Sequence, residues 1–339
     1  MYKKINTDKD KIGLYLTSKY LCYTLKSEEY RLYVCSIEDE SEIIFISEEK
    51  KVNYYSIYGD NLIYISRDED STFLVNLKSK NKNQINEILY DLVDNYYKKN
   101  KNYYCDNNHV YIYDLLSGNI VKIIKKTIIG YPKLGTDNYI ITNNNIYIYV
   151  YLKTDFSLLW QKDLSKLTQY TEWDGTEEEG KIREVYHYKD SVIVLTQVFI
   201  LQIDLQTGDI VYSLQLPAGL MELSIVDNRA YGCYGYHYME IDIEKGRLLK
   251  FIRIENAVYQ GKEYNAIMDS PKFHEGYVFH GVRLEGGYYA ISALDAQTEK
   301  RIWIDLLGTY MVEKIEFYEN KMFVSDSGGS LYIYEKEDA

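Results

Sequence analysis

The feature that most constrains the fold is a hairpin motif that recurs along the chain. In its clearest copy an alternating strand ends at Asp204, Gly208 follows in a tight turn, and Tyr212 stands eight positions after the aspartate. Aspartate accepts hydrogen bonds from turn amides, and glycine tolerates the positive φ that a tight hairpin needs. The motif therefore predicts a β-hairpin, and it gives its aspartates a structural role instead of a catalytic one.

The spacing of the copies predicts a repeat architecture. Aspartate recurs at the same motif position as Asp114, Asp242 and Asp295, and weaker copies place Ser36, Asn76, Leu152 and Glu335 there. The intervals are 40, 38, 38, 52, 38, 53 and 40 residues, close to the ~40 residues of a four-stranded, WD40-like propeller blade. We predict an all-β propeller of eight four-stranded blades, one domain over residues 1–339. Seven blades is the alternative, if the first or second unit is an irregular extension.

The last unit lacks one strand. It supplies Glu313–Tyr318, Met322–Ser325 and Leu331–Glu335 before the chain ends, whereas Tyr2–Asn6 precedes the first full unit. We predict that this N-terminal strand pairs with the last blade and closes the ring, because closure removes exposed sheet edges. Helical periodicity is nearly absent, and Gln84–Tyr97 is the only stretch for which we predict a turn or two of helix.

Charge and cysteine usage exclude several classes of function. The net charge is -12 and the pI about 5.1, which opposes binding to nucleic acid. With charged residues at the N-terminus and no long apolar run, we expect a cytoplasmic protein without a membrane span.

The sequence contains no motif typical of a metal site or of a reactive cysteine pair. Histidines 109, 187, 237, 274 and 280 share no metal spacing, and the four cysteines form no CxxC pair. We expect buried reduced thiols, no metal and no cofactor; a bridge between Cys22 and Cys35 stays open, because they can lie on neighbouring strands.

Several units resemble a known repeat. Ala293–Thr298 with Trp303, and Gly329–Tyr334, resemble the repeat of quinoprotein-type (PQQ-like) propellers, and Trp160 occupies the matching position in the fourth unit. The resemblance covers the whole chain as a repeat and implies the fold. The vicinal cysteine pair and the calcium site of the quinoprotein dehydrogenases have no counterpart here, so the resemblance implies a non-catalytic member.

Two long intervals indicate where a partner binds. The extra residues, roughly Ser165–Arg183 and Asn256–Lys272, follow an outer strand and precede the next inner strand, so we expect both insertions on one side. The long hairpin Gly281–Tyr289 is expected there too. The predicted partner-binding residues are Tyr170, Trp173, Asp174, Glu177, Glu178, Tyr259, Tyr264, Phe273, His274 and Arg283.

These observations favour a non-enzymatic scaffold, a monomer that binds a protein partner through one propeller face. A concrete version is a bacterial immunity protein that neutralises a toxin, because the chain is acidic and lacks catalytic groups; its partner would be basic. Two alternatives stay open. One is a small-ligand or hydrolase/lyase site in the central channel, and the other is a component of an envelope or secretion assembly.

Overall fold

The computed structural model describes residues 2–39, 41–85, 101–105, 109–114, 120–125, 129–172, 174–264 and 267–337. These residues form seven four-stranded sheets, one three-stranded sheet and two two-stranded hairpins. Two short 3-10 helices, η1 (Lys26–Glu28) and η3 (Ser165–Leu167), occur among them. Contacts divide the chain into two compact units. The N-terminal unit is Asp10–Asp163, and the C-terminal unit is Leu164–Ala339 together with Met1–Lys9.

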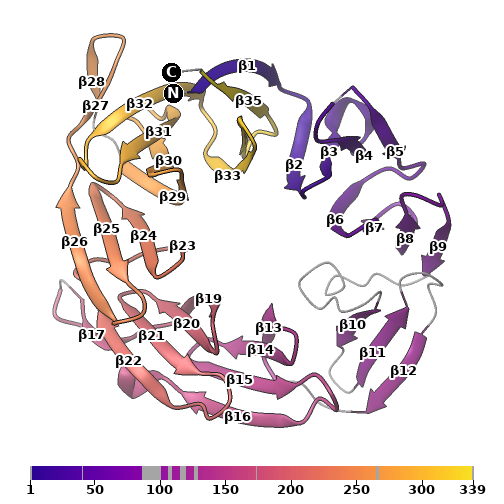
Figure 1. Ribbon diagram of the computed structural model, residues 1–339, viewed down its shortest axis with the longest axis horizontal. Coiled ribbons are helices and arrows are strands. Elements are labelled where there is room, and N and C mark those ends of the chain that lie inside the picture. Colours follow the sequence, from indigo (N-terminus) through magenta and orange to yellow (C-terminus); the bar gives the residue numbers. More distant parts are fainter. Residues whose placement is uncertain are drawn as a thin grey trace. The chain divides into compact units, whose positions relative to one another are not determined.

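The N-terminal unit contains four antiparallel sheets that follow one another in sequence (Figure 1). Their strands are β2 (Lys11–Leu16), β3 (Tyr20–Leu25), β4 (Arg31–Ser36) and β5 (Ile43–Ile46); β6 (Val52–Tyr58), β7 (Asn61–Ser66), β8 (Ser71–Asn76) and β9 (Lys82–Ile85); β10 (Lys101–Cys105), β11 (His109–Asp114) and β12 (Ile120–Lys125); and β13 (Tyr131–Gly135), β14 (Tyr139–Asn144), β15 (Tyr147–Leu152) and β16 (Leu158–Asp163).

The C-terminal unit contains four more sheets and the two hairpins. Its strands are β17 (Gln169–Thr171) and β18 (Glu177–Glu179); β19 (Ile182–Tyr188), β20 (Ser191–Thr196), β21 (Phe199–Asp204) and β22 (Ile210–Gln215); β23 (Ser224–Val226), β24 (Arg229–Tyr234), β25 (His237–Asp242) and β26 (Arg247–Arg253); β27 (Ala257–Tyr259) and β28 (Lys262–Tyr264); β29 (Ile267–His274), β30 (Tyr277–Arg283), β31 (Tyr289–Asp295) and β32 (Arg301–Gly308); and β33 (Val312–Tyr318), β34 (Lys321–Asp326), β35 (Leu331–Lys336) and β1 (Tyr2–Asp8).

The eight predicted motif positions each lie at a strand end or one residue before it. In six sheets the third strand ends at the predicted residue, and in the last sheet it ends at Lys336, one residue after Glu335. In the three-stranded sheet Asp114 ends the middle strand, β11. The eight repeat units are therefore confirmed as eight sheets, of which the third shows three strands among the described residues. Second and third strands are almost wholly buried, as in β20 and β21, so the core lies on these strands.

The motif turns have the predicted chemistry. The Oδ1 atom of Asp204 accepts hydrogen bonds from the backbone N–H groups of Gln206 (2.9 Å) and Thr207 (2.8 Å), and Gly208 has a φ of 76°. Where a unit lacks the glycine, Lys80 and Glu299 adopt φ values of 61° and 64° at the same position. The repeat thus keeps one turn geometry even where its side chains are not ideal for it.

The aromatic residue eight positions after the aspartate joins neighbouring sheets. Tyr212 of β22 donates a hydrogen bond to the carbonyl of Ile243 in the next sheet (2.8 Å). Its ring covers Gly246, where an added Cβ would lie 2.4 Å from the ring. Trp303 meets Tyr334 of the following sheet edge to face, with centroids 5.6 Å apart. The motif therefore encodes both a turn and a contact between sheets.

The N-terminal strand completes the last sheet, as predicted. β1 pairs antiparallel with β35, from Tyr2 opposite Lys336 to Asp8 opposite Leu331, and Figure 1 shows the two strands side by side. Tyr2 is buried and packs against Phe279 with ring centroids 5.6 Å apart. The ammonium of Lys4 lies 2.6 Å from the carboxylate of Asp305. Strand pairing, burial and an ion pair together hold this segment in place.

Two smaller predictions concern cysteines and helix. Cys22, Cys35 and Cys233 are buried and form no disulfide. Cys22 lies opposite Val34, and Cys35 opposite Leu21, so the bridge left open by the sequence does not form. The side chain of Cys105 lies outside the described part of the chain. In the stretch Gln84–Tyr97, Gln84 and Ile85 belong to β9 and the remainder lies outside the described residues.

Candidate partner-binding face

The strand order gives each sheet two distinct ends, because successive turns of an antiparallel meander alternate between them. In the C-terminal unit, the turns between first and second strands and between third and fourth strands form one side, here called the anchor face after Asp204, Asp242 and Asp295. The turns between second and third strands and the connections between sheets form the other side. It is called the hairpin face, because β17–β18 and β27–β28 lie in two of these connections.

Hydrogen bonds and an ion pair connect neighbouring turns on the anchor face. Tyr188 donates a hydrogen bond to Asn228 of the next sheet (2.7 Å). Glu244 binds the Asn228 amide (3.0 Å) and the ammonium of Lys189 (2.7 Å). The Tyr188–Asn228 and Lys189–Glu244 contacts join the sheet of β19–β22 to the sheet of β23–β26. The Asn228–Glu244 bond joins two turns of the second sheet, so the turn residues have a structural role.

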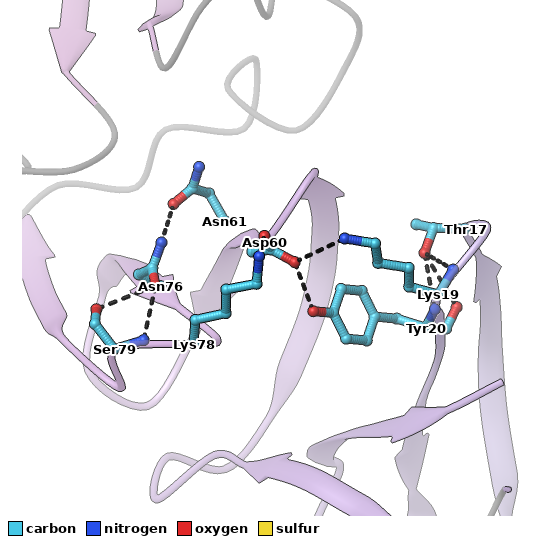
Figure 2. Close-up of polar contacts among 8 residues, drawn as sticks. All are labelled: Thr17, Lys19, Tyr20, Asp60, Asn61, Asn76, Lys78 and Ser79. Carbon is cyan, nitrogen blue, oxygen red and sulfur yellow. Dashed lines mark hydrogen bonds and ion pairs between the residues drawn. The ribbon is translucent and has the colours of Figure 1, made fainter. Parts of the chain in front are cut away.

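The N-terminal unit has a comparable polar joint, shown in Figure 2. Asp60, in the turn between β6 and β7, accepts a hydrogen bond from Tyr20 (2.8 Å) and pairs with Lys78 (2.7 Å) and Lys19 (3.4 Å). The hydrogen bonds from Lys78 and then Tyr20 lower the pKa of Asp60 to about 2. Asp60 is therefore a charged structural group between two sheets, and its low pKa makes it a poor general base.

Exposed apolar side chains of the C-terminal unit gather on the hairpin face. Seven of its exposed large hydrophobic side chains lie in turns or connections of this face: Leu167, Met221, Tyr234, Val258, Tyr288, Tyr310 and Met311. Four others lie on fourth strands: Ile5, Val211, Phe251 and Ile302. Among the described residues of this unit, none lies in a turn of the anchor face. Exposed apolar groups that gather on one side mark an interaction surface.

A cleft lies on the hairpin face beside β17. Its volume is about 350 Å³. Its lining comes from the first hairpin, the β20–β21 turn, the connection before β23 and the end of β24: Tyr170, Thr171, Glu172, Arg183, Gln197, Val198, Gly219, Leu220, Met221 and Tyr234. Tyr170 donates a hydrogen bond to the Glu172 carboxylate (3.0 Å), and the buried Oε1 atom of Gln197 has no hydrogen-bond partner.

A second, shallower pocket of about 500 Å³ lies at the base of the other hairpin. Arg253, Asn256, Val258 and Glu263 are among its lining residues. The guanidinium of Arg253 also lies over the ring of Tyr236, 5.5 Å from its centroid. Tyr234, which lines the first cleft, and Tyr236 belong to the same β24–β25 turn. This turn therefore separates the two pockets of the face.

The first hairpin carries four of the predicted residues that the structure describes. Tyr170 is half-buried against the cleft, and Asp174, Glu177 and Glu178 are exposed. Asp174 accepts a hydrogen bond from the backbone of Thr176 (3.0 Å), which fixes the hairpin turn. Trp173 lies outside the described residues, so the prediction that it anchors a partner stays a prediction.

The second hairpin brings Tyr259 and Tyr264 to the same face, and the end of β30 places Arg283 there. Tyr264 packs against a cluster that includes Ala257, Val282 and Leu284, which fastens this hairpin onto the sheet of β29–β32. Arg283 is exposed at the end of β30, opposite Ile267 at the start of β29. The turn that follows Arg283 therefore lies on the hairpin face, as predicted.

The structure does not bring Phe273 and His274 to this face. They are the last residues of β29, whose start adjoins the second hairpin, and about 3.3 Å per residue carries an eight-residue strand across the sheet. Phe273 stacks on Tyr231 (4.2 Å) and His274 on Phe317 (4.0 Å). The predicted common site is wrong for these two residues, because part of the supposed insertion is strand.

Sequence reasoning missed the exposed residues of the short turns. Met221, Tyr234 and Tyr310 lie in intervals of ordinary length. Tyr288 lies in the long hairpin Gly281–Tyr289, which was predicted for this face, but Tyr288 itself was not among the predicted residues. The available signal is an aromatic residue beside glycine between two strands, as in Tyr234-Gly235-Tyr236 and Gly286-Gly287-Tyr288. Such a residue has no core to enter and remains exposed.

The described part of the chain contains no helix with the length and hydropathy of a membrane span. It holds no group of three or more His, Cys, Asp or Glu side chains arranged to bind a metal ion.

Comparisons with known proteins show the fold. No protein-family model and no curated protein matches the sequence. BamB from Moraxella catarrhalis is similar in structure, with 10% identity over 99% of this chain and 100% of that chain and a TM-score of 0.65. The C-terminal WD40 domain of Sif2 gives 13% identity, coverage of 100% and 99%, and a TM-score of 0.66.

Saccharomyces cerevisiae Sqt1 gives 10% identity, coverage of 99% and 98%, and a TM-score of 0.67. At these identities the likeness shows the fold and nothing further. The chain is a β-propeller of four-stranded blades, as the repeat predicted.

Proposed function

We propose that this propeller is a non-enzymatic scaffold that holds a protein partner on its hairpin face. The observation that carries the proposal is the segregation of exposed apolar side chains to that face. Tyr234, Val258 and Tyr288 are 47%, 60% and 47% exposed, whereas polar side chains bridge the sheets on the anchor face. Aromatic and methionine side chains in a charged rim are the composition of protein interfaces.

The partner's chemistry follows from the charge. The chain has a net charge of -12, and the first hairpin presents Glu177, Glu178 and Glu179 to solvent. A basic partner is steered toward such a surface. We propose a PQQ-like, monomeric, cytoplasmic bacterial protein, in its most specific form an immunity protein that covers a basic toxin. This form requires a partner bound at nanomolar strength, so co-purification from the native host that recovers none would remove its support.

A channel site is the second candidate, and one group favours it. Burial raises the pKa of Glu222, which precedes the inner strand β23. Nearby inner strands carry Lys272 and Glu316, which pair at 3.0 Å. This pairing neutralises Glu316, one of the two carboxylates that a hydrolase or lyase in the channel could use, so the scaffold remains the better-supported function. Membership of an envelope or secretion assembly would use the same hairpin face.

The test is capture of the partner from the native host with matched variants. Tyr234→Asp and Arg283→Ala change the hairpin face, and Gln206→Asp changes an exposed anchor-face turn. We expect each hairpin-face change to weaken capture of one defined protein, by roughly 2 kcal/mol at a hot spot, and Gln206→Asp to leave it unchanged. Capture that survives Tyr234→Asp and Arg283→Ala but fails with Gln206→Asp would contradict the proposal.

A further inference from the structure

The cleft beside β17 has a layout that suits one long side chain. Buried Leu220, half-buried Val198 and exposed Met221 supply apolar surface for a methylene stem, and the tyrosines 170 and 234 supply aromatic surface. Acceptor groups are the Glu172 carboxylate and the buried Gln197 Oε1 atom, which has no partner. At about 350 Å³, the cleft is at the low end of the ~300–1,000 Å³ range of ligand pockets.

The charge around the cleft selects a cation. Residues 169–179 contain five carboxylates and no Lys or Arg: Glu172, Asp174, Glu177, Glu178 and Glu179. Arg183 also lines the cleft and offsets one of them, which leaves four negative charges. The β27–β28 hairpin, with Lys262 and Glu263, carries no net charge over residues 257–264. The two hairpins therefore differ in charge, and only the first has a field that attracts a basic side chain.

We propose that this cleft receives an arginine side chain of the protein partner. The inference rests on the proposed function and names one contact of the same face. A guanidinium group binds a carboxylate with two parallel hydrogen bonds and stacks on aromatic rings, whereas an ammonium does neither as well. In the cleft the guanidinium bonds Glu172 and Gln197, and its plane lies against Tyr234. Relief of repulsion among the hairpin carboxylates adds to the binding.

The probe is the tripeptide Gly-Arg-Gly, blocked at both ends, observed by methyl NMR. The chain has six methionines, and Met221→Leu assigns the signal from the cleft. We expect Gly-Arg-Gly to shift the Met221 methyl with weak affinity, since a single side chain buries little area. Met311, exposed elsewhere on the hairpin face, should not shift. The neutral peptide with citrulline in place of arginine should not change the chemical shift of the Met221 methyl. Gly-Lys-Gly should bind more weakly than Gly-Arg-Gly.

Matched variants locate the contacts. Glu172→Gln and Gln197→Leu should each weaken the binding of Gly-Arg-Gly, the first by roughly 10-fold or more because it removes a charged acceptor. Glu263→Gln, on the other hairpin, should leave the affinity unchanged. The proposal that the cleft binds arginine is overturned if the chemical shift of the Met221 methyl does not change with Gly-Arg-Gly. It is also overturned if that shift changes equally with the citrulline peptide or with Gly-Glu-Gly.

The two proposals fail separately. In one outcome the partner is captured on the hairpin face while Gly-Arg-Gly does not change the chemical shift of the Met221 methyl. This result overturns the proposed arginine site in the cleft and leaves the proposed function in place. A Met221 shift combined with partner capture that ignores every hairpin-face variant overturns the proposed function. When both hold, Glu172→Gln should weaken partner capture and tripeptide binding together.

Discussion

The anchor face and the hairpin face are opposite ends of the same strands, yet they use their turns differently. Anchor-face turns repeat one geometry, with an aspartate that accepts hydrogen bonds from turn amides, and polar side chains of these turns bridge neighbouring sheets. Hairpin-face connections vary in length and leave apolar side chains exposed. This difference indicates that the repeated part of the sequence stabilises the fold, whereas the irregular connections are free to vary and to bind a partner. Substitutions on the two faces should therefore affect different measurements.

The largest expected effect comes from two glycines, one on each face. Gly246 has a φ of 58°, and an added Cβ would lie 2.4 Å from the Tyr212 ring, whereas Gly261 has a φ of 77° and nothing within 4 Å. Gly246→Ala should cost about 3 kcal/mol of unfolding free energy, from backbone strain plus the clash, and Gly261→Ala about 1 kcal/mol, from strain alone. Denaturant unfolding of both variants measures the difference between these two losses of unfolding free energy. Equal losses would show that the anchor-face turn is not tightly packed.

The next effect tests the polar joint at Asp60. Because its pKa is lowered to about 2, the carboxylate stabilises the fold above the unfolded pKa near 4, and this contribution is lost as the pH falls toward 2. We expect Asp60→Asn to lose about 1.5 kcal/mol at pH 7, allowing for solvent screening. Unfolding measured between pH 7 and pH 2.5 should show the two curves converging. Asp209→Asn, in an exposed turn, is the control for the loss of one surface carboxylate.

We expect a small gain in unfolding free energy from a substitution where the motif turn lacks glycine. Lys80 occupies a positive φ of 61° and is exposed, so Lys80→Gly should raise the unfolding free energy by about 0.5 kcal/mol. Gln206→Gly is the matched control in another motif turn; Gln206 is not among the residues with positive φ, and this change should lower stability by a similar amount. A loss with Lys80→Gly, seen in thermal melts, would mean that contacts of its side chain outweigh the strain.

The smallest effect on stability belongs to the hairpin face. Tyr234→Ser and Val258→Ser remove side chains that are 47% and 60% exposed, and each should change the unfolding free energy by no more than about 0.5 kcal/mol. Their effect should instead appear in partner capture. A large drop in melting temperature for either variant would assign these side chains to the core and remove the contrast between the faces.

The sequence predicted the repeated parts well and the irregular parts less well. Asp204 and its counterparts located the strand before the motif turn in each of the eight sheets, because turn chemistry and strand alternation act together there. Phe273 and His274 were misplaced because β29 contains Pro271 and its register shifts between Asp269 and Lys272, which hides the alternation of a strand. Tyr234 and Tyr310 were missed because their connections have ordinary length. Exposure in a short turn depends on how neighbouring sheets pack, and local sequence does not encode that packing.

Site-specific photo-crosslinking in the native host tests the central claim most directly. A photoreactive phenylalanine analogue placed at Tyr234 samples the hairpin face, and the same analogue at Gln206 samples the anchor face. We predict one covalent adduct of defined mass from position 234 and none from position 206. An adduct that forms only at position 206, or equally at both positions, would contradict the assignment of the hairpin face as the binding surface.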